Sequence, residues 1–168
     1  MARKFKELSE REILALAIAL EEEDGRVYAD FAEGLRETYP ATAKLFENMR
    51  EEESQHRASL IDTYRARFGE HIPLVRRQDI KGFIQRRPFW LTRPLKISEV
   101  RKQAEIMELE TTRFYERAIN QVTDAGIRKL LGDLAEIERK HQKLLDEAQA
   151  KAKEAAAKYE AELAKKQK

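Results

Sequence analysis

Two copies of one short pattern place a carboxylate and an imidazole on the same side of a helix. The pattern Glu-x-x-His occurs once as Glu53 to His56 and again as Glu138 to His141. Residues three apart share a helix face, so each pair presents an oxygen donor and a nitrogen donor together. One such pair arises easily by chance in a glutamate-rich chain. Two copies, each inside an apolar stripe, indicate a shared site.

Two further glutamates interrupt apolar stripes in other parts of the chain. Glu21 shares a face with Tyr28, and Glu108 shares a face with Tyr115, each seven residues further on. Several acids converging in a helical core would repel one another, and buried charges are usually paired or metal-bound. Two divalent cations would balance them. Oxygen and imidazole donors suit iron or manganese, and the absence of cysteine excludes a thiolate site and argues against structural zinc.

Long helices are expected to position these side chains. Ser9 and Glu12 form a capping box, Pro40 fits the first turn of a second helix, Gly69 ends that helix, and Ser98 is expected to cap a third. The predicted helices cover residues 9–37, 41–68 and 99–122, and a fourth runs from about 127 towards the C-terminus.

The helices are expected to form two hairpins joined by a long crossover over residues 69–97. This predicts an all-α, ferritin-like four-helix bundle with an extended C-terminal helix. A simpler up-and-down bundle with an unstructured insert is the alternative. The spacings from Glu21 to Glu53 and from Glu108 to Glu138, 32 and 30 residues, indicate an internal hairpin repeat with a pseudo-twofold axis. A short helix is predicted near Gln78–Gln85.

Composition limits the classes of protein to which the chain can belong. The 168 residues include 33 Lys and Arg against 31 Asp and Glu, so the net charge of +2 does not indicate a nucleic-acid binder. The longest apolar run, Ile13–Leu20, is far shorter than the roughly 20 residues that span a bilayer. No signal-peptide pattern is present. We therefore expect a soluble, intracellular piece of protein.

Four segments carry a resemblance to a known family. LEEEDGRVYADFA, EEESQH, MELETTRFYERA and EIERKH resemble the erythrin, or rubrerythrin-type, branch of the ferritin-like superfamily, over roughly residues 10–148. The resemblance implies two iron ions per chain, which manganese or zinc could replace. The metal ligands that it implies are Glu21, Glu53, His56, Glu108, Glu138 and His141.

The same resemblance suggests supporting residues. Rubrerythrins have an extra carboxylate on the third helix. Glu105, three residues before Glu108, is similar to that carboxylate, and the resemblance therefore implies Glu105 as a seventh metal ligand. Tyr28 and Tyr115 are expected to donate to ligand carboxylates, or else simply to pack in the core. The remaining acids expected to face solvent are Glu51, Glu52, Glu110 and Glu136. The 168 residues contain no cysteine and hence no rubredoxin-type iron site, so we expect the electron route of rubrerythrin peroxidases to be missing.

A narrower likeness is to the N-terminal cytosolic domain of bacterial membrane-bound ferritins. It implies a di-iron domain over residues 1–148 and a helical stalk over 149–168 leading to a membrane domain, on the cytoplasmic side of the inner membrane. The implied function is oxidation of Fe(II) by O₂ or peroxide in iron detoxification and export. The alternatives are a peroxidase fed by an external reductant and a non-enzymatic helical interaction module.

The sequence is compatible with more than one role for the C-terminal tail and for the crossover. The seam of Leu145, Ala148, Ala152, Ala155 and Tyr159 fits a partner helix, or else the tail is a solvated spacer. The basic crossover is expected to pair with bundle acids and a subunit interface, with membrane proximity second and nucleic acid not expected. A homodimer is predicted. His71 is expected to be a surface or packing residue.

Overall fold

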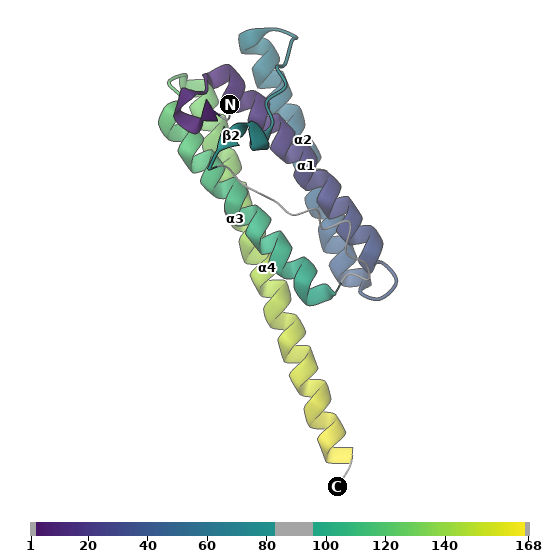
Figure 1. Ribbon diagram of the computed structural model, residues 1–168. Coiled ribbons are helices and arrows are strands. Elements are labelled where there is room, and N and C mark those ends of the chain that lie inside the picture. Colours follow the sequence, from purple (N-terminus) through teal and green to yellow (C-terminus); the bar gives the residue numbers. More distant parts are fainter. Residues whose placement is uncertain (1–2, 83–95, 167–168) are drawn as a thin grey trace.

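The computed structural model describes residues 3–82 and 96–166, and four long helices dominate it. They are α1 (Glu10–Leu35), α2 (Pro40–Phe68), α3 (Ile97–Gln121) and α4 (Ala125–Lys166). Helices α1 and α2 form one antiparallel hairpin and α3 and α4 form another, and the two hairpins lie side by side (Figure 1). The predicted all-α, ferritin-like four-helix bundle is therefore confirmed.

Most of the predicted helix boundaries follow from local chemistry. Ser9 and Glu12 form the capping box of α1, and Pro40 occupies the first turn of α2. Gly69 ends α2 with φ of 81°, a left-handed conformation that glycine adopts without steric cost. The predicted cap at Ser98 is wrong. The amides of Glu99 and Val100 both donate to the carbonyl of Lys96, so α3 begins two residues earlier than predicted, at Ile97.

The described part of the crossover does not form the helix predicted near residues 78–85. A single 3₁₀ turn, η2 (Arg77–Asp79), leads into a two-residue strand, β2 (Ile80–Lys81). That strand pairs in parallel with β1 (Arg3–Lys4), which precedes the 3₁₀ turn η1 (Phe5–Glu7). The guanidinium of Arg77 donates to both carboxylate oxygens of Glu23, at 2.8 and 2.6 Å, and so ties the crossover to α1. Residues 83–85 of the predicted helix lie outside the described residues.

The basic crossover is described only in part. Arg77 pairs with Glu23 of α1, in agreement with the expected pairing to acids of the bundle, whereas Arg76 pairs with Asp79 within the crossover itself. The crossover also contains Arg86, Arg87, Phe89, Trp90 and Arg93, which lie outside the described residues. His71 is exposed, and its backbone carbonyl accepts hydrogen bonds from Arg11 and Tyr64.

The bundle has two apolar clusters, one towards each end. One contains Leu16, Leu60 and Tyr115, and the other contains Tyr28, Phe46 and Met107. The buried polar side chains lie along the same helices between residues of the two clusters. A layer of acids and histidines therefore divides the hydrophobic core. Burying these groups is costly unless their charges are neutralised and their polar atoms have partners.

Helix α4 continues beyond the bundle as a single projecting rod, coloured yellow in Figure 1. Leu145 is buried against the bundle, whereas Tyr159 is 64% exposed. Glu154 and Lys158, four residues apart on this rod, form an ion pair at 2.7 Å. Among the described residues, no helix is both long enough and apolar enough to cross a bilayer.

Candidate metal centre

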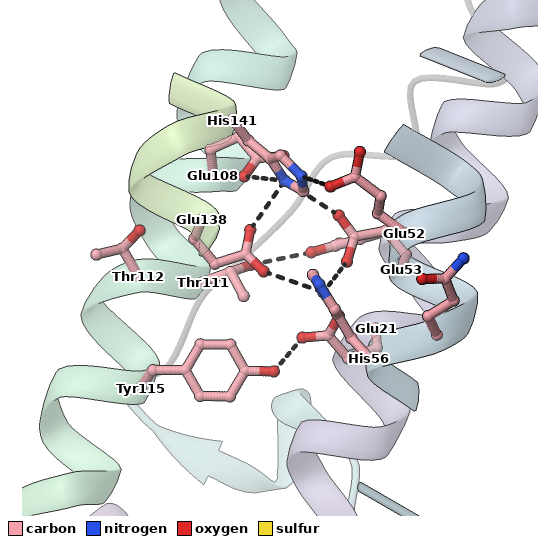
Figure 2. Close-up of polar contacts among 12 residues, drawn as sticks. Glu21, Glu52, Glu53, His56, Glu108, Thr111, Thr112, Tyr115, Glu138 and His141 are labelled. Carbon is pink, nitrogen blue, oxygen red and sulfur yellow. Dashed lines mark hydrogen bonds and ion pairs between the residues drawn. The ribbon is translucent and has the colours of Figure 1, made fainter. Parts of the chain in front are cut away.

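All four helices supply side chains to one buried polar centre. Helices α1 and α3 contribute one glutamate each, and α2 and α4 contribute one Glu-x-x-His pair each (Figure 2). None of the six side chains belongs to a residue more than 7% exposed. The residues are Glu21, Glu53, His56, Glu108, Glu138 and His141.

The donors form two groups that share two members. Within each group, one donor atom from every residue lies within 4.8 Å of the others. Glu53 and Glu138 belong to both groups. The first group is completed by Glu21 and His56, and the second by Glu108 and His141. The arrangement therefore provides two adjacent donor groups that share two carboxylates.

The two histidines face the centre through the same ring nitrogen. Nδ1 of His56 lies 3.1 Å from Glu21 Oε2 and 3.2 Å from Glu53 Oε2. Nδ1 of His141 lies 3.3 Å from Glu108 Oε2 and 3.6 Å from an oxygen of Glu138. The ring centroids are 6.1 Å apart. The imidazoles thus stand on opposite sides of the shared carboxylates, one for each group.

Two buried tyrosines cross between the hairpins. The hydroxyl of Tyr28 in α1 donates to Glu108 in α3, and the hydroxyl of Tyr115 in α3 donates to Glu21 in α1. Burial raises the pKa of both phenols well above its ordinary value, and the nearby carboxylates add to that effect. Both hydroxyls therefore keep their protons and hold one oxygen of each glutamate in place.

The electrostatics of the metal-free centre show how closely the acids are packed. Burial, together with the charge of neighbouring glutamates, raises the pKa of Glu53 and Glu138 well above its usual value. Burial is the largest single effect on Glu21 and opposes its ionisation, but the hydrogen bonds from His56, Glu53 and Tyr115 and the charge of His56 together outweigh it and lower the pKa of Glu21. Burial disfavours the charged form of His141, yet Glu108 and Glu138 raise its pKa to about 11. Without a cation, the centre retains protons in its place.

Three buried donor atoms fit the hypothesis of bound metal. Glu108 Oε2, Glu138 Oε1 and His141 Nδ1 have no hydrogen-bond partner within the described part of the chain. Such orphaned atoms are costly unless something else binds them. All three face the shared centre, and hard carboxylate oxygens with imidazole nitrogens suit iron or manganese. The donor set therefore fits two divalent metal ions.

The structure does not bring Glu105 into this centre. Glu105 is partly exposed on α3 and belongs to neither donor group. Glu108 is therefore the residue of α3 that the two donor groups contain. The buried face of α3 at this level is formed by Ala104, Met107 and Glu108, and Glu105 is not among the buried residues.

Two acids lie beside the centre although the sequence patterns did not predict them there. Glu52, expected to face solvent, places Oε2 at 2.9 Å from Nε2 of His141. Asp24 is buried and accepts a hydrogen bond of 2.9 Å from the hydroxyl of Thr111. Asp24 lies three residues after Glu21, a spacing that could have marked it as inward-facing. Nothing in the sequence marks Glu52, because its role depends on the approach of α4.

Comparison with known proteins supports this description of the fold and centre. The family model for rubrerythrin matches residues 12–149. A Thermotoga maritima crystal structure, provisionally described as a ferritin-like diiron-carboxylate protein, is 19% identical with a TM-score of 0.69, covering 86% of this chain and 97% of its own. A hypothetical protein from Pyrococcus furiosus is 23% identical with the same TM-score, covering 86% of this chain and 90% of its own. No curated protein matches the chain. Because the family model spans most of the sequence and all six buried donors, the chain belongs to the rubrerythrin family.

Proposed function

We propose that the chain binds two iron ions and oxidises Fe(II) with O₂ or peroxide. The observation that carries the proposal is the overlap of the two buried donor groups at Glu53 and Glu138. In this assignment those two glutamates would help to hold both ions. Glu21 and His56 would complete the donors for one ion, and Glu108 and His141 those for the other.

The protein's own groups would prepare the centre for this reaction. When bound, two ferrous ions supply two electrons, which together with two protons reduce one hydrogen peroxide to two waters. Tyr28 and Tyr115 hold the carboxylates of Glu108 and Glu21 in position. The apolar clusters on either side limit the access of bulk water. Glu53 and Glu138 give up the protons that they hold in the metal-free state.

Iron detoxification is the cellular role that this chemistry would serve. The export role and the membrane domain rest only on the resemblance to membrane-bound ferritins, and they stay predictions, as does the homodimer. A peroxidase would use the same centre but would need an external reductant to regenerate Fe(II). The chain has no cysteine and offers no thiolate for that electron delivery.

Anaerobic Fe(II) titration of the metal-free protein, followed by pulses of air and of peroxide, tests the proposal. We expect saturation at two irons per chain and oxidation in both pulses. Glu53→Ala with His56→Ala should abolish oxidation. Glu51→Ala with Gln55→Ala, at exposed positions of the same helix, is the matched control.

Three outcomes separate the alternatives. Oxidation that stops after one equivalent of peroxide, even with a reductant present, supports simple iron oxidation. Repeated peroxide turnover with the reductant favours the peroxidase. An absence of binding at micromolar iron would contradict both and leave the helical interaction module.

A further inference from the structure

Glu52 links the most deeply buried histidine to the surface. Its Oε2 lies 2.9 Å from Nε2 of His141. The Glu52 side chain is 46% exposed, whereas that of His141 is 1% exposed. In Figure 2, Glu52 approaches the outer edge of the His141 ring, and the shared carboxylates lie on its inner side. The contact also joins α2 to α4, and therefore one hairpin to the other.

The other histidine has no such support. Within the described part of the chain, Nε2 of His56 has no protein hydrogen-bond partner. The contacts of this imidazole with Glu21, Glu53 and Glu138 are all made through Nδ1. The sequence repeat explains the difference. Glu52 immediately precedes Glu53, and the residue immediately preceding Glu138 is Ile137, which can accept no hydrogen bond.

A carboxylate that accepts a hydrogen bond from Nε2 favours the tautomer in which Nδ1 carries a free lone pair. A neutral imidazole carries one proton, and Glu52 accepts it when it resides on Nε2. The lone pair of Nδ1 is then available to the centre, where this atom has no hydrogen-bond partner. The same contact restricts rotation of the ring. Outer partners of this kind orient a metal-ligating histidine and increase its basicity.

From this asymmetry we propose that Glu52 positions His141 and makes the two cation positions unequal. The inference rests on the proposed function, since it assumes that both donor groups bind metal. The group containing His141 receives a pre-oriented imidazole and binds its ion more tightly. The group containing His56 has no outer partner on Nε2 to orient its imidazole for a metal ion, and it fills second.

Calorimetric titration of the metal-free protein with Zn²⁺ tests the inequality without relying on turnover. We expect two resolved binding steps in the unchanged protein. Glu52→Ala should weaken the tighter step about 10–100-fold and leave the weaker step nearly unchanged. Glu52→Gln should recover most of the affinity, because its amide oxygen can still accept from Nε2. Glu51→Ala removes an equal charge from the neighbouring exposed position and should behave as the unchanged protein.

Nitrogen NMR of the Zn²⁺-loaded protein supplies the second readout, and three histidines make assignment practical. We expect His141 to be metal-bound through Nδ1 and to retain a slowly exchanging proton on Nε2. That proton should exchange rapidly in Glu52→Ala and be protected again in Glu52→Gln.

Several results would overturn the inference. They are unchanged affinity in Glu52→Ala, equal weakening of both steps, failure of Glu52→Gln to restore binding, or metal binding through Nε2 of His141. Each leaves the proposed function intact, because Zn²⁺ still binds. Absence of Zn²⁺ and Fe²⁺ binding in the unchanged protein would instead contradict the proposed function, and the inference with it.

Discussion

The two helical hairpins contribute the same donors to the centre but surround them differently. The α1–α2 hairpin supplies Glu21, Glu53 and His56, and the α3–α4 hairpin supplies Glu108, Glu138 and His141. Each hairpin thus contributes the terminal donors of one group and one of the two shared glutamates. The repeat accounts for the donors themselves.

The differences between the hairpins lie just outside the donor set. Glu52 supports His141 from α2, whereas the equivalent position in α4 is Ile137. Asp24 and Thr111 occupy equivalent positions, each three residues after a donor glutamate, and they hydrogen-bond to each other across the bundle. A repeat can therefore keep a symmetric donor set while its neighbouring residues make the halves unequal.

Removing both shared carboxylates should eliminate both halves of the centre at once. Glu53→Gln with Glu138→Gln takes one donor from each hairpin and two donors from each group. We expect the affinity for both ions to fall more than about 100-fold, since even outer partners are worth about 10–100-fold. Calorimetric Zn²⁺ titration measures this loss. The melting temperature of the metal-free protein should not fall, because glutamine resembles the protonated, uncharged glutamates that the metal-free centre holds at these two positions.

A variant confined to one hairpin provides the control for this double substitution. Glu21→Gln with His56→Asn removes the terminal donors of one group only. One binding step should then survive. Loss of both steps would show that the halves cannot bind metal independently, and retention of both would contradict the assignment of donors.

Metal binding should join the hairpins and stabilise the bundle. The helices pack far more extensively within each hairpin than between hairpins, so cations held by donors from both would add a link. At a free metal concentration 100 times the Kd, one site contributes about 2.7 kcal/mol, a rise of about 5–11 °C in melting temperature for a chain of this size. Thermal melts with Zn²⁺ and then with excess chelator measure it. An unchanged melting temperature on metal addition would contradict the link.

The two crossing tyrosines allow a matched comparison of the halves. Tyr28→Phe removes the donor to Glu108, and Tyr115→Phe removes the donor to Glu21. Each change should lower metal affinity about 10-fold, because each frees one ligand carboxylate to reorient. Titration of both variants side by side checks whether the effects are equal. A loss confined to one variant would show that the asymmetry extends beyond Glu52.

The smallest expected effect is on the free energy of unfolding, and it comes from the cap at the start of the first helix of a hairpin. Helix α1 has the Ser9 and Glu12 capping box, whereas α3 has no side-chain cap. The hydrogen bond from Arg3 lowers the pKa of Glu12 to about 2, below its ordinary 4.5. A lowered pKa in the folded state stabilises the protein above pH 4.5, and this contribution disappears as the pH falls towards 2.

Glu12→Gln should therefore reduce the free energy of unfolding by about 1 kcal/mol near neutral pH, a typical cost for losing a cap. The difference from the unchanged protein should shrink between pH 4.5 and 2. Urea unfolding at several pH values measures both quantities. A difference that is constant with pH would rule out the ionised carboxylate as its cause.

Much of the fold could be read from local patterns. The helices follow from apolar spacing, and their ends at Ser9, Pro40 and Gly69 follow from backbone chemistry that involves only neighbouring residues. The crossover could not be predicted in this way. Its strand depends on Arg3, and its anchoring depends on Glu23, more than 50 residues away. The prediction that Ser98 caps α3 was wrong because the helix begins at the carbonyl of Lys96, which accepts the first two helical hydrogen bonds without help from a side chain.

The sequence by itself determined the residue types of the candidate donors and the helix face of each one. Glu-x-x-His and the spacing of Glu21 and Glu108 within apolar stripes are properties of single helices, whose period is set by backbone geometry. Only the tertiary structure decided which donors are shared, that Glu105 stays outside, and that Glu52 reaches His141. Those outcomes depend on how far and at what angle the helices approach one another, which is set by packing between residues distant in the chain.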